Sequence, residues 1–311
     1  MRTCARWLPL LGALLLLDGC VYVGDWGDSD AYRSDFHSTY PLSAGGRVTV
    51  ESFNGSIDLI GWDQNSVEVN GTKHASNRGA LDDLKIDIRA MPDAVSVRAV
   101  RNSDSFSHGG VRFSIRVPRK ALLDLISSTN GKIDVEDVEG GARLRTTNGG
   151  IRVVRCKGEV EAQTKNGSID AQDVSGNAHF HTSNGSVHTE TRDGSLEAST
   201  SNGSITARVT NPGGSSTIRL TSSNGHIELT MDGPQLTEVR AATSNSSILL
   251  RLPASANARV RASTSSHSPI TSEFDGSRSE KRHNDMEETI GSGGPLLDLR
   301  TTNGPIRIVK L

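Results

Sequence analysis

Aromatic and apolar residues are scarce in this chain. Of its 311 residues, 4% are aromatic and 34% are hydrophobic, whereas glycine alone accounts for 32 residues. This composition is too poor in apolar side chains for one large conventional core. The apolar residues that are present recur too regularly for a disordered chain. A repeat architecture, in which each unit contacts only its neighbours, accounts for both observations.

An excess of charge of either sign is also missing. Lys and Arg total 34 and Asp and Glu total 36, so the formal net charge is −2. A nucleic-acid-binding protein normally carries a basic excess on one face. We therefore expect no nucleic-acid partner.

The N-terminus has the pattern of a signal peptide. Arg2 and Arg6 provide positive charge, and residues 8–17 form an apolar run that is too short to cross a bilayer. The segment Leu17-Asp18-Gly19-Cys20 resembles a bacterial lipobox. We therefore expect residues 1–19 to be removed and Cys20 to be lipidated, with an ordinary signal peptide or an uncleaved anchor as the alternatives.

Lipidation at Cys20 would attach the protein to a membrane of the cell envelope. By resemblance to lipoproteins of Gram-negative bacteria, Val21 after this cysteine favours the outer membrane, on its periplasmic side or its surface. Residues 20–44 are expected to form a lipidated tether, although Trp26, Tyr32 and Phe36 could instead dock on the first coil of the domain. Cys4 would be lost on processing, which leaves Cys156 without a disulfide partner.

A period of 18 residues organises the rest of the chain. Asn-Gly pairs recur at this spacing at Asn130, Asn148, Asn166, Asn184 and Asn202. Looser copies stand at Asn54, Asn224, Asn245-Ser246, His267-Ser268 and Asn303. In each copy, the third residue after the marker is Ile or Val, as at Ile133, Ile151 and Ile169. We expect these asparagines to form a structural ladder of turns.

Each unit contains two stretches in which apolar and polar residues alternate, which is typical of half-buried strands. Ile133 and Val135 belong to the first kind of stretch, and Ala142 and Leu144 belong to the second. Asn-Gly is expected to supply positive φ at one turn. A glycine ten residues after the marker, at Gly140, Gly158, Gly176 and Gly194, is expected to relieve the backbone at the other turn.

These observations predict an all-β fold, namely a parallel β-solenoid (β-helix) with about 18 residues and two short strands per coil. An antiparallel meander would not require a fixed repeat length. Hexapeptide helices place an aliphatic residue at every sixth position, but Glu139 and Arg145 follow Ile133 at that spacing. The column Asp134, Arg152, Asp170, His188 and Thr206 cannot form the calcium ladder of a β-roll. No cofactor or metal is therefore expected.

The outward positions also form columns. One of them alternates in charge through Arg143, Glu161, His179, Glu197 and Arg219. Such side chains can pair between neighbouring strands, so we interpret them first as register devices and second as a binding face. His179 and His181 share one face, but His188 belongs to the other sheet, so the three cannot converge on a zinc ion.

Few residues along the regular coils have the properties of catalytic or stacking groups. Cys156 occupies an inward column with Val138 and Val174, as expected of a buried apolar residue. Phe180 is the only aromatic residue between Asn130 and Pro269, and its parity points inward. This argues against a sugar-stacking platform but leaves recognition by Ser, Thr and Asn side chains open.

The predicted domain spans residues 45–311. Residues 45–117 are expected to form N-terminal coils or a cap, because open solenoid ends expose strand edges. Residues 118–274 contain the regular coils. Residues 275–295 are expected to be a charged loop, and residues 296–311 the final coil.

The segment Val48-Thr49-Val50-Glu51-Ser52-Phe53-Asn54-Gly55-Ser56-Ile57, the Val117-Pro118 pair and the Thr-Asn-Gly units resemble the bacterial putative-adhesin family of β-strand-repeat domains of unknown function. The resemblance covers about residues 45–311. It implies an exported parallel β-solenoid without a catalytic site to carry over.

We therefore expect a non-enzymatic cell-envelope lipoprotein that acts as a rigid scaffold or an adhesin-like binding rod. Its partners would be the membrane, through Cys20, and an envelope protein or a glycan. The alternatives are a polysaccharide-degrading enzyme on a β-helix and a partner in envelope-stress signalling.

Overall fold

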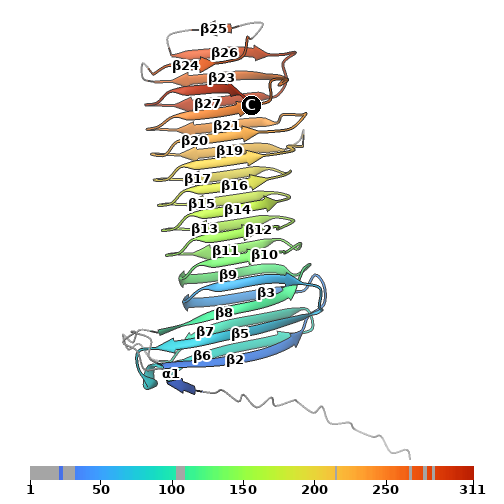
Figure 1. Cartoon of the computed structure of the whole chain (residues 1–311), viewed down its shortest axis with the longest axis vertical. Coiled ribbons are helices and arrows are strands. Elements are labelled where there is room, and N and C mark those ends of the chain that lie inside the picture. Colours follow the sequence, from blue (N-terminus) through green and yellow to red (C-terminus); the bar gives the residue numbers. More distant parts are fainter. Residues whose placement is uncertain are drawn as a thin grey trace, which may run out of the picture.

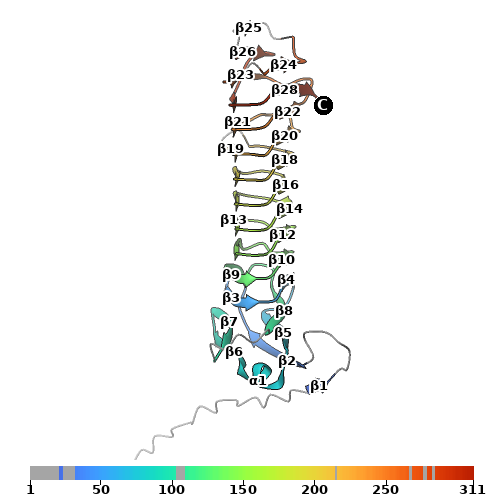
Figure 2. The same ribbon diagram turned by 90° about the vertical axis from the view of Figure 1, so that its left-hand side faces the viewer.

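The computed structural model describes residues 21–23, 32–102, 109–213, 216–265, 268–275, 279–281 and 284–311. The described residues form a long rod of stacked strands, with two sheets facing each other along its axis (Figures 1 and 2). Within the described part of the chain each sheet has 14 strands, and all regular coils contribute one strand to each sheet. The predicted all-β parallel solenoid is therefore confirmed.

The first sheet, called sheet A, has the spatial order β1 (Val21–Val23), β2 (Tyr32–Pro41), β5 (Ser66–Ala75), β8 (Gly109–Pro118), β4 (Ile57–Trp62), β10 (Ile133–Glu136), β12 (Ile151–Val154), β14 (Ile169–Val174), β16 (Val187–Thr191), β18 (Ile205–Val209), β20 (Ile227–Met231), β22 (Ile248–Leu252), β28 (Ile306–Lys310) and β24 (Ile270–Ser272).

The second sheet, called sheet B, has the order β25 (Ser279–Lys281), β26 (Asp285–Ile290), β23 (Ala258–Thr264), β27 (Leu296–Thr301), β21 (Glu238–Thr243), β19 (Thr217–Ser222), β17 (Leu196–Thr200), β15 (Ala178–Thr182), β13 (Val160–Thr164), β11 (Ala142–Thr146), β9 (Leu122–Asn130), β3 (Arg47–Asn54), β7 (Ala94–Arg101) and β6 (Leu84–Met91).

Each regular coil lies in parallel register on the previous one. Ile151 pairs with Ile133 on one side and with Ile169 on the other, as the 18-residue period requires. These side chains are fully buried between the two sheets. Because each coil adds the same inward positions, a single narrow core runs along the whole rod.

The order of the coils in space differs from their order in sequence at both ends. The coil β3–β4 lies between β7–β8 and β9–β10, although the β7–β8 coil comes between these segments in the chain. At the other end, the last coil, β27–β28, lies between β21–β22 and β23–β24. The prediction of residues 296–311 as a terminal coil is correct in sequence only, because this coil is internal in space.

Antiparallel strands and a helix close the N-terminal end of the rod. Strands β2, β5 and β8 pair antiparallel in sheet A, and β6 pairs antiparallel with β7 in sheet B. The helix α1 (Arg78–Asp83) begins at Asn77, whose side chain accepts a hydrogen bond from the amide of Ala80. Leu81 of this helix is buried in a separate small apolar cluster with Ala75 and Leu84, and Figure 2 shows α1 below the coils. Among the described residues, no helix is long and apolar enough to cross a membrane.

The predicted tether is too long. Residues 32–41, which were assigned to it, form β2, and this strand pairs along its whole length with β5. The ring of Phe36 packs edge-on against that of Phe113, with centroids 6.2 Å apart. Docking of Tyr32 and Phe36, the alternative left open above, is therefore correct. Trp26, Cys20 and the signal peptide lie outside the described residues.

The predicted charged loop over residues 275–295 is also wrong in part. Asp285–Ile290 forms β26, which pairs antiparallel with β23, and β25 pairs with β26 in turn. Met286 and Ile290 are buried beneath this strand. By pairing with β23, β26 covers the edge of sheet B. An open solenoid end requires such protection.

Candidate functional site

The turns from sheet B to sheet A form one edge of the rod, called here the asparagine corner. From Asn130 onward, the side-chain amide of each asparagine donates to the side-chain oxygen of the asparagine in the coil beneath it, at N···O distances of 2.7–2.9 Å. The ladder joins Asn54, Asn130, Asn148, Asn166, Asn184, Asn202, Asn224, Asn245 and Asn303. Asn245 keeps its place although serine follows it. His267 lies outside the described residues.

A second ladder lies beneath the asparagines. The buried Oγ1 of Thr164 donates to the carbonyl oxygen of Gly149 in the coil below at 2.8 Å, and Thr182 does the same to Gly167. A buried backbone carbonyl without a partner is costly, so these hydroxyls stabilise the turns. The equivalent donors are Ser128, Thr146, Thr200, Ser222, Thr243 and Thr301.

The glycines of the asparagine corner serve a different purpose from the one predicted. Positive φ occurs at Gly55 but not at Gly149, Gly167 or Gly185. A Cβ added at Gly167 would lie 2.0 Å from the carbonyl oxygen of Gly149. Glycine is therefore required because successive turns approach each other too closely for a side chain. At the opposite corner, where the chain turns from sheet A to sheet B, the predicted positive φ is confirmed at Gly158, Gly176 and Gly194. In the first coil, positive φ lies at Gly141 instead of Gly140.

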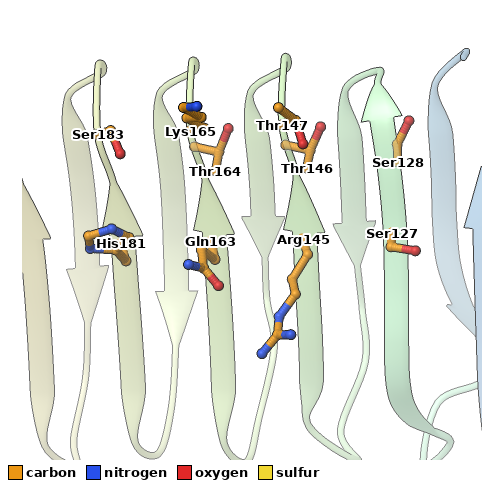
Figure 3. Close-up of a pocket in the computed structure, with 10 residues that line it drawn as sticks. All are labelled: Ser127, Ser128, Arg145, Thr146, Thr147, Gln163, Thr164, Lys165, His181 and Ser183. Atoms are coloured by element: carbon orange, nitrogen blue, oxygen red, sulfur yellow. The ribbon is translucent and has the colours of Figure 1, made fainter. Parts of the chain in front are cut away.

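Beside the asparagine corner, the outer face of sheet B is hollowed into a groove of about 450 Å³. Figure 3 shows its lining in rows that cross four neighbouring coils. One row is Ser127, Arg145, Gln163 and His181, which are register neighbours on β9, β11, β13 and β15. The rest of the lining is Ser128, Thr146, Thr147, Thr164, Lys165 and Ser183. The groove is therefore polar and runs along the rod axis.

A second hollow of about 380 Å³ continues this surface across β17. It shares Gln163 and His181 with the groove and adds Ser199, to whose hydroxyl the Nδ1 of His181 lies at 2.8 Å. His179 approaches Glu197 at 3.5 Å. His188 stands on β16 of the other sheet, and the described residues hold no group of three or more His, Cys, Asp or Glu side chains suited to a metal ion.

The column of alternating charge lies beside the groove. Glu161 bridges Arg143 at 3.0 Å and Arg145 at 3.1 Å. Burial would raise the pKa of Glu161, but hydrogen bonds from the two guanidinium groups outweigh it and lower this pKa. The same column places Arg219 next to Arg240, which breaks the alternation further along.

The opposite corner carries its own stack of charge. Arg155 has a positive φ of 51° and donates two hydrogen bonds to Asp137 in the coil below, at 2.8 and 3.1 Å. These hydrogen bonds lower the pKa of Asp137. Next to it, Cys156 is buried as predicted, and burial raises the pKa of its thiol to about 11. A thiol in this state is a poor nucleophile.

One further pair of acids stands in register on sheet A. Asp58 of β4 lies beside Asp134 of β10. Burial and the neighbouring carboxylate raise the pKa of Asp58. A carboxyl group with a raised pKa beside a second carboxyl group is the combination that acid–base catalysis on glycans uses.

The groove was not identified from the sequence. One signal for it exists in the sequence. The residue before the turn marker is Phe53 in the first copy and Lys165 in the copy at Asn166, and it is Thr or Ser in the other eight copies, at Thr129, Thr147, Ser183, Ser201, Ser223, Ser244, Ser266 and Thr302. A single cation in a column of hydroxyls marks the coil at the centre of the groove. Lys165 and Arg145 were not singled out as candidate residues.

Comparison with known proteins places this architecture in context. A family model described as Toastrack DUF4097 matches residues 64–309. No curated protein matches the chain. Among solved structures, a putative adhesin from Parabacteroides merdae is similar at 8% identity over 88% of this chain and 96% of that one, with a TM-score of 0.48.

Two other solved structures are also similar. A putative adhesin from Bacteroides fragilis matches at 11% identity over 88% of this chain and 97% of that one, with a TM-score of 0.39. A putative adhesin from Parabacteroides distasonis matches at 9% identity over the same shares, with a TM-score of 0.43.

Proposed function

The chain belongs to the toastrack DUF4097 family, and on this premise we propose that it is a non-enzymatic lipoprotein of the cell envelope that acts as a rigid, adhesin-like binding rod. Its lipid anchor would be Cys20. The uninterrupted asparagine ladder from Asn54 to Asn303 carries the proposal, because it ties each coil from β3–β4 to β27–β28 to the next one along a single edge. A rod held in this way can present a fixed surface at a distance from the membrane.

The chemistry of the described side chains supports binding more than turnover. The thiol of Cys156 is buried. His179 and His181 have partners on the neighbouring coil, and Glu161 is held between two arginines. Such paired groups suit a preformed recognition surface.

Cell fractionation of a Cys20→Ala variant tests the anchor. The variant is expected in the soluble periplasmic fraction, whereas the parent stays with the outer membrane. A Cys156→Ala variant is the matched control and is expected to fractionate like the parent. Retention of the Cys20→Ala variant in the membrane would show that lipidation does not anchor the protein.

A polysaccharide-degrading enzyme is the second candidate, and it draws on the Asp58–Asp134 pair. Two carboxyl groups, one with a raised pKa, are the machinery of many glycosidases. Incubation of the purified protein with a panel of polysaccharides would reveal reducing ends if this candidate is correct. An Asp134→Asn variant would then lose the activity.

A further inference from the structure

We propose that the groove on sheet B binds an extended anionic polysaccharide, laid along the rod axis with its acidic groups on Lys165 and Arg145. The proposal rests on the function proposed above, since it names the ligand class of the binding rod. It is argued from the charge of the groove, its spacing and its hydrogen-bonding groups.

The lining of the groove is cationic. Arg145 and Lys165 contribute two positive charges, and none of the described residues that line the groove is acidic. Arg145 donates one hydrogen bond to Glu161 through Nη2. A guanidinium group has five N–H donors, so Arg145 can still hold a carboxylate. Charge complementarity therefore favours an anionic ligand.

The spacing of the groove favours a sugar chain over a peptide. Its residues repeat once per coil, since Arg145, Gln163 and His181 occupy the same register position on adjacent strands. Neighbouring strands lie ~4.7–4.9 Å apart, whereas an extended peptide advances by only ~3.2–3.4 Å per residue. Because successive side chains of an extended peptide point to opposite faces, those on one face are ~6.4–6.8 Å apart and cannot face every coil. A pyranose ring in an extended chain advances by close to one strand spacing, so one sugar can face each coil.

The polar groups of the groove match the remaining chemistry of a sugar acid. Gln163 offers both a donor and an acceptor, and the hydroxyls of Thr147 and Ser183 flank Lys165 on the adjacent coils (Figure 3). Sugar rings are usually held by stacking on aromatic side chains. Here ion pairs and hydrogen bonds would supply the binding energy instead, which makes recognition dependent on the acidic group.

Titration calorimetry of the purified full-length protein tests the proposal. The probe is a tetramer of β-1,4-linked mannuronate, and β-1,4-mannotetraose is the matched neutral control with the same linkage. The mannuronate tetramer is expected to bind, with an affinity that falls as salt is added. Equal binding of the neutral tetramer would overturn the proposal, as would the absence of binding to the mannuronate tetramer.

Two variants locate the site. Lys165→Ser restores the hydroxyl of the neighbouring coils and is expected to weaken binding roughly three- to fivefold, as the loss of one exposed charge pair would. Lys157→Ser makes the same change of charge at the opposite corner, where Lys157 pairs with Glu139, and should bind like the parent. An unchanged affinity in Lys165→Ser, or an equal loss in Lys157→Ser, would contradict the proposed site.

Two further probes distinguish other anionic partners. A tetraglutamate peptide and a four-nucleotide single-stranded DNA carry similar charge at a different spacing. Binding of either one as tightly as the mannuronate tetramer would show that the groove reads charge alone, and the proposal would fail. Failure of the groove would leave the membrane anchor untouched, because fractionation of the Cys20→Ala variant tests that function independently.

Discussion

Gly167 lies so close to Gly149 in the coil below that a Cβ on Gly167 would stand 2.0 Å from the carbonyl oxygen of Gly149. This close approach repeats along the asparagine corner, at Gly131, Gly149, Gly185, Gly203 and Gly225. The corner therefore combines a row of side-chain amides with a row of positions that admit no side chain. Its regular spacing is set by the backbone and not by the side chains.

Gly167→Ala is expected to lower the free energy of unfolding by about 3 kcal/mol, the upper end of the usual cost of overpacking, because the added methyl group meets backbone that cannot rotate away. Chemical denaturation followed by circular dichroism measures this loss. Gly213→Ala is the control, since no described atom lies within 4 Å of a Cβ there. Equal stability of the two variants would contradict the steric role of the corner glycines.

Thr182→Val is expected to cost about 1–3 kcal/mol. The substitution preserves shape but leaves the carbonyl oxygen of Gly167, which accepts from Thr182 at 2.8 Å, without this donor. Thr189→Val provides the matched control in the opposite sheet, because the buried hydroxyl of Thr189 has no hydrogen-bond partner among the described residues. Thr189→Val should be neutral or stabilising. A similar loss in both variants would mean that the hydroxyl ladder does not support the turns.

Asp58→Asn is expected to stabilise the protein at neutral pH. Burial and Asp134 raise the pKa of Asp58, so the folded state holds this proton more tightly than the unfolded chain does. The associated stability is complete below the ordinary value of 3.8 and is lost as pH rises through the raised pKa. The gain from Asp58→Asn should therefore be present at pH 7, at up to about 1 kcal/mol after solvent screening, and absent at pH 3.

Thermal melts at the two pH values check this expectation. Asp170→Asn is the control, because Asp170 has Arg152 and His188 as its register neighbours instead of a second carboxylate. It should not stabilise the protein at pH 7. A gain from Asp58→Asn that persists unchanged at pH 3 would show that repulsion between Asp58 and Asp134 is not its cause.

Cys156 is expected to resist thiol reagents in the folded protein. Its side chain is 1% exposed, and burial raises its pKa to about 11, so little thiolate forms at pH 8 and the reagent cannot reach it. Labelling with a chromogenic disulfide should therefore follow the unfolding transition in urea. Rapid labelling in the absence of denaturant would place Cys156 at the surface and refute its inward assignment.

The coil and its inward faces could be predicted because their signals are local. Ile133, Ile151 and Ile169 follow the asparagine markers at a fixed distance, and alternation alone assigns each side chain to a face. The role of Gly167 could not be inferred in this way, since the clash that it avoids involves Gly149 in another coil. Asn-Gly is a signal for positive φ in an isolated turn, and stacking replaced that requirement with another one.

The groove depends on information that the repeat does not contain. The sequence places Arg145, Gln163 and His181 in one outward column, but equivalent columns exist on both sheets. The conformations of the side chains decide which column lines a groove. The side chain of Arg145, for example, is turned toward Glu161 by a hydrogen bond. Strand β26 was missed for a related reason, because the inward position between the buried Met286 and Ile290 is a buried glutamate, Glu288, so that the segment resembles a polar loop.

The last coil in the sequence, β27–β28, is inserted between two earlier coils at the C-terminal end of the rod. Because β27–β28 separates β21–β22 from β23–β24, removal of residues 295–311 is expected to do more than shorten the rod. Leu297, Leu299, Ile306 and Ile308 are fully buried between these coils. Without them, β23 and β24 lose their parallel partners, whereas the coils up to β20 keep theirs.

Hydrogen exchange of the truncated protein distinguishes the two arrangements. Interleaving predicts that the amide of Arg259, which donates to Pro295 in the deleted segment, loses its protection although it precedes the deletion, while residues 133–231 stay protected. A rod whose coils followed sequence order would keep β23 in place on β21 and lose only its last coil. Retained protection of the Arg259 amide would therefore contradict the observed order of the coils, because its acceptor is removed with the deletion, whereas the amide of Thr264 can still donate to Asn284 beside β26.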